Sequence, residues 1–120
     1  MKQRTPERIE FLGDIIITAV EGGVGYWAMI SGYRWHGVPS PVATLTEHES
    51  HKDGDPITGK LDIDSIASAI GRIVRGEIKL RADLIKLIAG ASAANDGGDI
   101  DAEGADVIAQ VAVLGDVIYG

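Results

Sequence analysis

The sequence predicts an α+β domain in which a small three-stranded antiparallel meander packs with about four helices. Near both ends of the chain, apolar residues recur every three or four positions, which is typical of amphipathic helices. Between these ends, residues 24–63 form short β-branched and aromatic runs separated by proline and glycine turns, which is typical of strands. A chain of 120 residues has the length of one domain with a single hydrophobic core, so residues 1–120 are expected to be a single domain.

The first helix is predicted to begin at Thr5 and Pro6. Threonine accepts a hydrogen bond from a free helix amide, and proline lacks the amide that would otherwise be unpaired. The apolar stripe of this helix consists of Ile9, Leu12, Ile16, Ala19 and Val20. Gly22 and Gly23 are expected to end the helix by adopting positive φ.

Three strands are predicted after this helix. The first covers Val24 to Trp35 with a kink at Gly32, the second Val42 to His48, and the third Ile57 to Ile63. The prolines and glycines between these segments favour turns. This order of short strands and short loops indicates a meander.

The remainder of the chain is predicted to be helical. Asp64 is the expected N-cap of a helix that stops at Gly76. The small residues 89–94 of the next helix predict tight packing against another backbone. Asp101 caps a last helix with few polar positions, which we expect to be buried.

Composition excludes some classes of function. The formal net charge of -7 and the pI near 4.8 disfavour nonspecific nucleic-acid binding, which usually requires a basic patch. The absence of cysteine excludes disulfides and thiolate chemistry. The longest aliphatic run, residues 15–17, is too short to span a membrane, so we expect a cytoplasmic protein without a membrane partner.

Three motifs resemble known sites but lack the required spacing. The glycines at 22, 23 and 25 follow a helix and precede a strand, the reverse of the order in a dinucleotide-binding loop. The acidic turn at residues 95–103 lacks the ligand spacing of a calcium loop, so a helix-capping turn is favoured, although a cation remains an alternative. His36, His48 and His51 lack zinc-site spacing and are expected to be solvated. We therefore predict no metal, no cofactor and no catalytic residue.

The strongest remaining signal is an aromatic cluster in the first predicted strand. Both tryptophans and two of the three tyrosines lie between positions 26 and 35. Trp27, Tyr33 and Trp35 share parity and would point to one side of a regular strand. The predicted ligand-binding residues are Gly22, Gly23, Tyr26, Trp27, Tyr33, Arg34 and Trp35. The rings would stack a base and Arg34 would bind a phosphate, while the alternative is that the rings complete a core or a subunit interface.

Two stretches carry a family resemblance: "TAVEGGVGYWA" at 18–28 and "NDGGDIDAEGADVIAQVAVLGDVIYG" at 95–120. They resemble a group of small uncharacterised proteins encoded by actinobacterial phages and related mobile elements. The resemblance implies a small accessory protein, and such proteins often blunt host defence by binding a host protein or sequestering a nucleotide signal.

Two functions are therefore open. The first is a non-enzymatic oligomer that binds and sequesters a small nucleotide-type signal. The second is an acidic protein-interaction module that inhibits or adapts a host protein, and an enzyme ranks third. We expect a homo-oligomer because the last helix is apolar nearly all round, and because Ile17 and Val113 occupy positions where a lone domain would carry polar residues.

Overall fold

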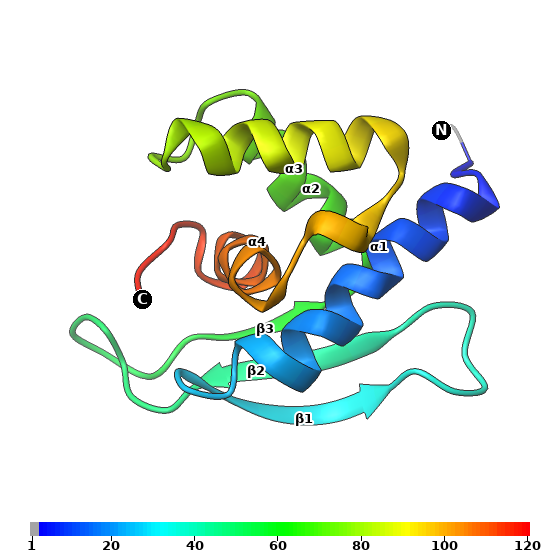
Figure 1. Cartoon of the computed structure of the whole chain (residues 1–120). Helices are drawn as coiled ribbons and strands as arrows, with labels where there is room; N and C mark the ends of the chain where they lie inside the picture. The colour runs from blue at the N-terminus through cyan, green and yellow to red at the C-terminus, as the bar shows by residue number, and fades with distance from the viewer. Residues whose placement is uncertain (1–2) are drawn as a thin grey trace.

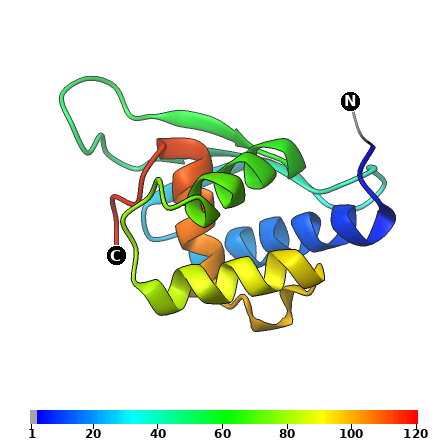
Figure 2. The same ribbon diagram turned by 90° about the horizontal axis from the view of Figure 1, so that it is seen from above.

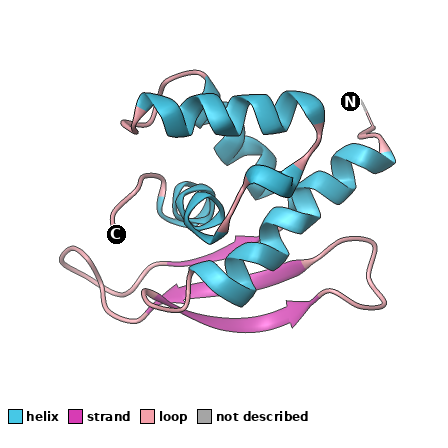
Figure 3. Cartoon of the chain, viewed as in Figure 1, coloured by secondary structure: helices cyan, strands magenta, loops and turns pink. Residues whose placement is uncertain are grey.

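The computed structural model describes residues 3–120 and has the predicted α+β architecture, with four α-helices over one face of a three-stranded antiparallel sheet (Figures 1 and 3). The elements in chain order are α1 (Pro6–Thr18), β1 (Ala28–Arg34), β2 (Val42–Glu47), β3 (Thr58–Leu61), α2 (Ile63–Val74), α3 (Ala82–Ala94) and α4 (Ala102–Leu114). The strand order β1-β2-β3 confirms the meander.

Helix α1 begins where the sequence predicted but ends differently. Thr5 Oγ1 accepts a hydrogen bond from the Arg8 amide at 3.2 Å, which confirms the cap. The helix continues as a π-helical turn over Ala19–Gly23, so the expectation of positive φ at Gly22 and Gly23 was wrong. The reason for glycine at position 23 is space: a Cβ there would lie 2.8 Å from the carbonyl oxygen of Ala102.

The strands are shorter than predicted because their pairing stops before the expected ends, although β2 begins at Val42 as expected. Ala28 pairs with Glu47 at one end of the β1–β2 ladder, and Thr46 pairs with Thr58 between β2 and β3. The expected kink is present, since Gly32 has a φ of +59° and the register shifts between Ser31 and Arg34. Positions 24–27 form a turn that precedes β1.

Helix α2 is capped two residues earlier than expected. The Asp62 side chain accepts a hydrogen bond from the Ser65 amide at 2.8 Å, and Ser65 Oγ accepts one from the Asp62 amide at 3.0 Å. This reciprocal capping box makes Asp62 the N-cap. Asp64 instead lies in the first turn and pairs with Arg4 at 2.6 Å. As predicted, the chain leaves the helix at Gly76, which has a φ of +79°.

Helix α4 is the buried centre of the fold, as the sequence predicted. It lies between the sheet and helices α2 and α3 (Figures 1 and 2), and all residues from Gly104 to Val111 are buried. Val113 contacts β3, where a Cβ on Gly59 would lie 3.0 Å from Val113 Cγ1. The apolar character of α4 is therefore explained within one chain, and this ground for expecting a homo-oligomer no longer holds.

Helix α3 forms the outer layer over α2. Leu84, Ile88 and Ala91 face the core. The small residues 89–94 do not form a tight contact, because a Cβ on Gly90 would meet no atom within 4 Å and Ala93 and Ala94 are exposed. The prediction of close backbone packing at this run was wrong. Across residues 3–120, no helix combines the length and the apolar character needed to cross a membrane.

Replacing Gly23 by alanine is expected to destabilise the fold by about 1–3 kcal/mol, because the added methyl group would press on the backbone of α4. Gly22→Ala is the matched control, since its Cβ would lie 3.7 Å from the Ala102 side chain, an ordinary contact. Urea unfolding of both variants measures the difference. Equal effects of the two substitutions would contradict this account of Gly23.

Candidate functional site

The three aromatic residues predicted to share one face do not share it. Trp27 precedes β1 and is only 2% exposed, whereas Trp35 follows β1 and is 56% exposed. Tyr33 is half-buried, and its hydroxyl donates a hydrogen bond to Glu21 at 2.9 Å. The alternation fails because the strand starts at Ala28 and is interrupted at Gly32.

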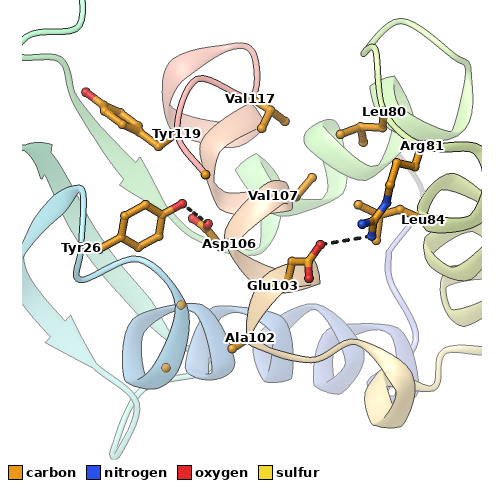
Figure 4. A pocket seen from close by; sticks show the side chains of 13 residues that line it. Tyr26, Leu80, Arg81, Leu84, Ala102, Glu103, Asp106, Val107, Val117 and Tyr119 are labelled. Carbon is orange, nitrogen blue, oxygen red and sulfur yellow. Dashed lines mark hydrogen bonds and ion pairs between the residues drawn. The ribbon is translucent and has the colours of Figure 1, made fainter.

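A cleft of about 530 Å³ opens beside the turn that precedes β1 (Figure 4). It is lined by Gly22, Gly23, Tyr26, Leu80, Arg81, Leu84, Ala102, Glu103, Asp106, Val107, Val117, Tyr119 and Gly120. Gly22, Gly23 and Tyr26 are thus the predicted site residues that the fold brings together. Trp35 lines a separate groove, and Trp27, Tyr33 and Arg34 are not among the lining residues of either cavity.

The floor of the cleft is a buried hydrogen-bond network centred on Asp106 of α4. The carboxylate accepts hydrogen bonds from the Tyr26 hydroxyl at 2.6 Å and from Trp27 Nε1 at 2.7 Å. The amide nitrogen of Gln110 donates to both oxygens at 3.2 Å. Partial desolvation of the ring, and next the Asp106 carboxylate, raise the pKa of Tyr26 to about 12. Tyr26 therefore stays a neutral hydrogen-bond donor at neutral pH.

Gln110 also fixes the last residues of the chain against α4. Its side-chain oxygen accepts hydrogen bonds from the amides of Ile118 and Tyr119, both at 2.8 Å. Its side-chain nitrogen donates to the Tyr119 carbonyl at 3.1 Å. This clamp places Val117 and Tyr119 along one wall of the cleft.

The ring of Tyr119 joins the cleft to a second buried carboxylate, Glu47 of β2. The ring stacks on Trp27 with centroids 5.6 Å apart, and its hydroxyl donates to Glu47 at 2.6 Å. Glu47 also accepts hydrogen bonds from the Ile57 amide at 2.9 Å and from His51 Nδ1 at 2.7 Å. Burial opposes ionisation of Glu47, but the donors from Tyr119, Ile57 and His51 outweigh it and lower its pKa to about 2.

His51 is therefore not simply solvated, as the sequence suggested. It is half-buried, and its ring meets Tyr119 edge-on with centroids 6.3 Å apart. His48 Nε2 lies 2.9 Å from the Gly25 carbonyl oxygen, and His36 packs edge-on against Trp35. Two of the three histidines thus tie polar loops to neighbouring segments.

The rim of the cleft carries an exposed ion pair. Arg81, just before α3, lies 3.1 Å from Glu103 of α4 (Figure 4). It also lies 3.5 Å from Asp83. The side chains of Arg81 and Glu103 are both 63% exposed, so water screens their attraction and the pair contributes little to stability. The guanidinium therefore remains accessible to a ligand in the cleft.

The acidic turn at 95–103 caps helices. Asp96 Oδ1 accepts a hydrogen bond from the Gly98 amide at 2.9 Å, and Asp101 Oδ1 accepts one from Gly104 at 3.0 Å. The capping role predicted for Asp101 is confirmed. Within residues 3–120, no three histidine, aspartate or glutamate side chains are grouped so that they could hold a metal ion.

The sequence reasoning missed Asp106, Gln110, Glu47, Tyr119 and Arg81. Asp106 and Gln110 were detectable, because two polar residues four positions apart in an otherwise apolar buried helix lie on one face and need partners. Arg81 carried no such signal, since it is one of several arginines on exposed helix ends. Comparisons with family models, curated proteins and solved structures found no match to this chain.

Substitution of the two tryptophans should change the free energy of unfolding by very different amounts. Trp27→Ala is expected to cost about 3–5 kcal/mol, because it opens a core cavity and removes the hydrogen bond to Asp106. Trp35→Ala should change the free energy of unfolding by less than about 1 kcal/mol, because that ring is exposed. Thermal melts compare the variants, and a large loss in Trp35→Ala would show that its ring supports the fold.

Acid stability should depend on Glu47. Its pKa is lowered on folding, so its contribution is present above the ordinary value of 4.5 and is lost as pH falls toward about 2. Glu47→Gln should lower stability at neutral pH by about 2 kcal/mol and flatten the pH dependence in this window. Glu49→Gln, an exposed carboxylate two residues away, is the control. Urea unfolding from pH 7 to 2 measures both, and an unchanged acid slope in Glu47→Gln would contradict the assignment.

Proposed function

We propose that this chain is a small ligand-binding protein that holds a nucleotide-type molecule in the cleft beside Tyr26 without transforming it. The observation that carries the proposal is that an exposed aromatic ring and an exposed guanidinium, Tyr26 and Arg81, line the same cleft. Its volume of about 530 Å³ lies within the range typical of small-molecule sites, about 300–1,000 Å³.

The walls of the cleft suit a flat, partly apolar ligand. Its aliphatic lining consists of Leu80, Leu84, Val107 and Val117. The Tyr26 residue is 57% exposed, although its hydroxyl is held by Asp106, so the ring is positioned while surface remains for stacking. A nucleobase on this ring would bury apolar surface on both partners.

The cation of the proposed site is Arg81 and not Arg34. Arg34 ends β1 and is not among the residues that line the cleft, whereas Arg81 lines it. A guanidinium binds phosphate oxygens in pairs with good geometry. Binding a phosphate here would replace the Glu103 contact, which is weak because it is exposed.

The resemblance to small phage-encoded proteins extends the proposal to a biological role. The bound molecule would be a host defence signal of nucleotide type, which the protein sequesters in the cytoplasm by stoichiometric binding. A homo-oligomer with one cleft per copy would hold several ligands, and exposed Met29 and Ile118 offer apolar surface for such an assembly.

The proposal is tested by native mass spectrometry of protein purified from its natural host, followed by calorimetric titration with a panel of linear and cyclic nucleotides. We expect a retained ligand, and in the titration a loss of at least tenfold in affinity for Arg81→Ala. Tyr26→Leu should lose ten- to hundredfold, since stacking contributes roughly 1–3 kcal/mol per base. Native mass spectrometry also reports the number of copies in the assembly.

Two variants serve as controls. Arg75→Ala removes a guanidinium that is 62% exposed and paired with Glu77. Arg75 does not line the cleft, so this variant should bind the nucleotide with unchanged affinity. Tyr26→Phe keeps the ring and should retain most of the affinity. No retained ligand together with no binding across the panel, or full binding by Arg81→Ala, would overturn the proposal.

A further inference from the structure

A second opening, the α1 groove, lies between helix α1 and the connection from β1 to β2. It encloses about 460 Å³ and is lined by Pro6, Ile9, Glu10, Gly13, Asp14, Ile17, Trp35, Val38, Pro39, Ser40 and Pro41. None of these residues lines the cleft beside Tyr26. The connection runs beside α1 in two views of the molecule (Figures 1 and 2).

The walls of the α1 groove are held in place by a close contact at its base. A Cβ on Gly13 would lie 2.9 Å from Pro41 Cδ, so glycine is what lets the connection approach the helix. Pro39 and Pro41 restrict the backbone on either side of Ser40. A partner that enters the α1 groove would therefore not have to order these walls, which lowers the entropic cost of binding.

Residues 3–120 leave part of the apolar surface of the α1 groove exposed. Trp35 is 56% exposed, and the adjoining Ile9 and Ile17 are only half-buried. Tryptophan is the residue type most enriched among those that dominate the binding energy of protein interfaces. Ile17, which the sequence marked as an apolar residue out of place, lies in this groove.

In the part of the chain that the structure describes, the charged residues that line the α1 groove, Glu10 and Asp14, are both acidic. Glu10 and Asp14 stand one helical turn apart, a spacing at which like charges repel. Partial desolvation, and next the charge of Glu10, raise the pKa of Asp14. Within residues 3–120, neither carboxylate forms an ion pair, and Arg34 and His36, which flank Trp35 in sequence, are not lining residues.

We propose that the α1 groove is a docking site for an extended segment of a partner protein that carries lysine or arginine between apolar residues. The apolar residues of the segment pack on Ile17 and on the prolines. Its cation lies against Glu10 and Asp14 and over the Trp35 ring, where charge pairing and a cation–π contact act together. This surface is independent of the cleft, so the inference does not rest on the proposed ligand.

A random dodecapeptide library, displayed and selected on the immobilised protein, tests this inference. Selection against Trp35→Ala in solution removes peptides that bind elsewhere, and a thermal melt verifies that this variant is folded. We expect the enriched peptides to share a lysine or arginine flanked by apolar residues. In titrations with the synthetic peptides, Glu10→Gln with Asp14→Asn should weaken binding at least tenfold.

The matched control neutralises two carboxylates at the other end of the sheet. Asp53→Asn with Asp55→Asn makes the same change of net charge in the exposed loop between β2 and β3, and it should change affinity less than twofold. If both double variants lost the same affinity for the peptides, the effect would come from net charge alone, and the proposed docking site would be wrong. The inference also fails if no peptide depends on Trp35, if enriched peptides lack a cation, or if free N-acetylarginine amide binds as tightly as the peptides.

Discussion

The structure depends on one buried polar pair, Asp106 and Gln110 on the central helix α4. An apolar helix packs almost equally well at several rotations, whereas buried polar groups must meet their partners and so fix a single arrangement. Asp106 holds the turn before β1 through Tyr26 and Trp27, and Gln110 holds the backbone at Ile118 and Tyr119. Loss of one partner would leave a buried group unsatisfied, which costs about 1–3 kcal/mol.

This pair also explains why the cleft lies where it does. Gly23 lets the end of the π-helical turn contact the start of α4, and the clamp at Gln110 brings the last residues back along the same helix. Between these two attachments, one side of α4 lines the cleft and faces the start of α3. Arg81 lines the cleft on that side. The cleft is thus a consequence of how the turn after α1 and the last residues of the chain are attached to one helix, opposite the start of α3.

The sequence was informative where local chemistry decides the structure. The cap at Thr5, the turn glycine at position 76, the strand order and the buried last helix followed from periodicity and turn residues. The site was harder to predict from the sequence. The expectation that Trp27 and Trp35 point to the same side assumed a regular strand through both residues, but pairing with β2 begins only at Ala28. Contacts such as Tyr119 with Glu47 join positions 72 apart, and no local pattern carries that information.

The two openings differ in which of their polar groups remain free to bind. The floor of the cleft is already satisfied by the chain itself, since Asp106 accepts from Tyr26, Trp27 and Gln110, so recognition there falls to the exposed rim at Arg81 and Glu103. Within residues 3–120, the carboxylates of Glu10 and Asp14 in the α1 groove form no ion pair and remain free to bind, whereas the apolar walls supply contact area but little selectivity. Substitutions at these exposed charges should therefore alter binding with little effect on folding, whereas substitutions at Asp106, Gln110 or Glu47 should alter folding first.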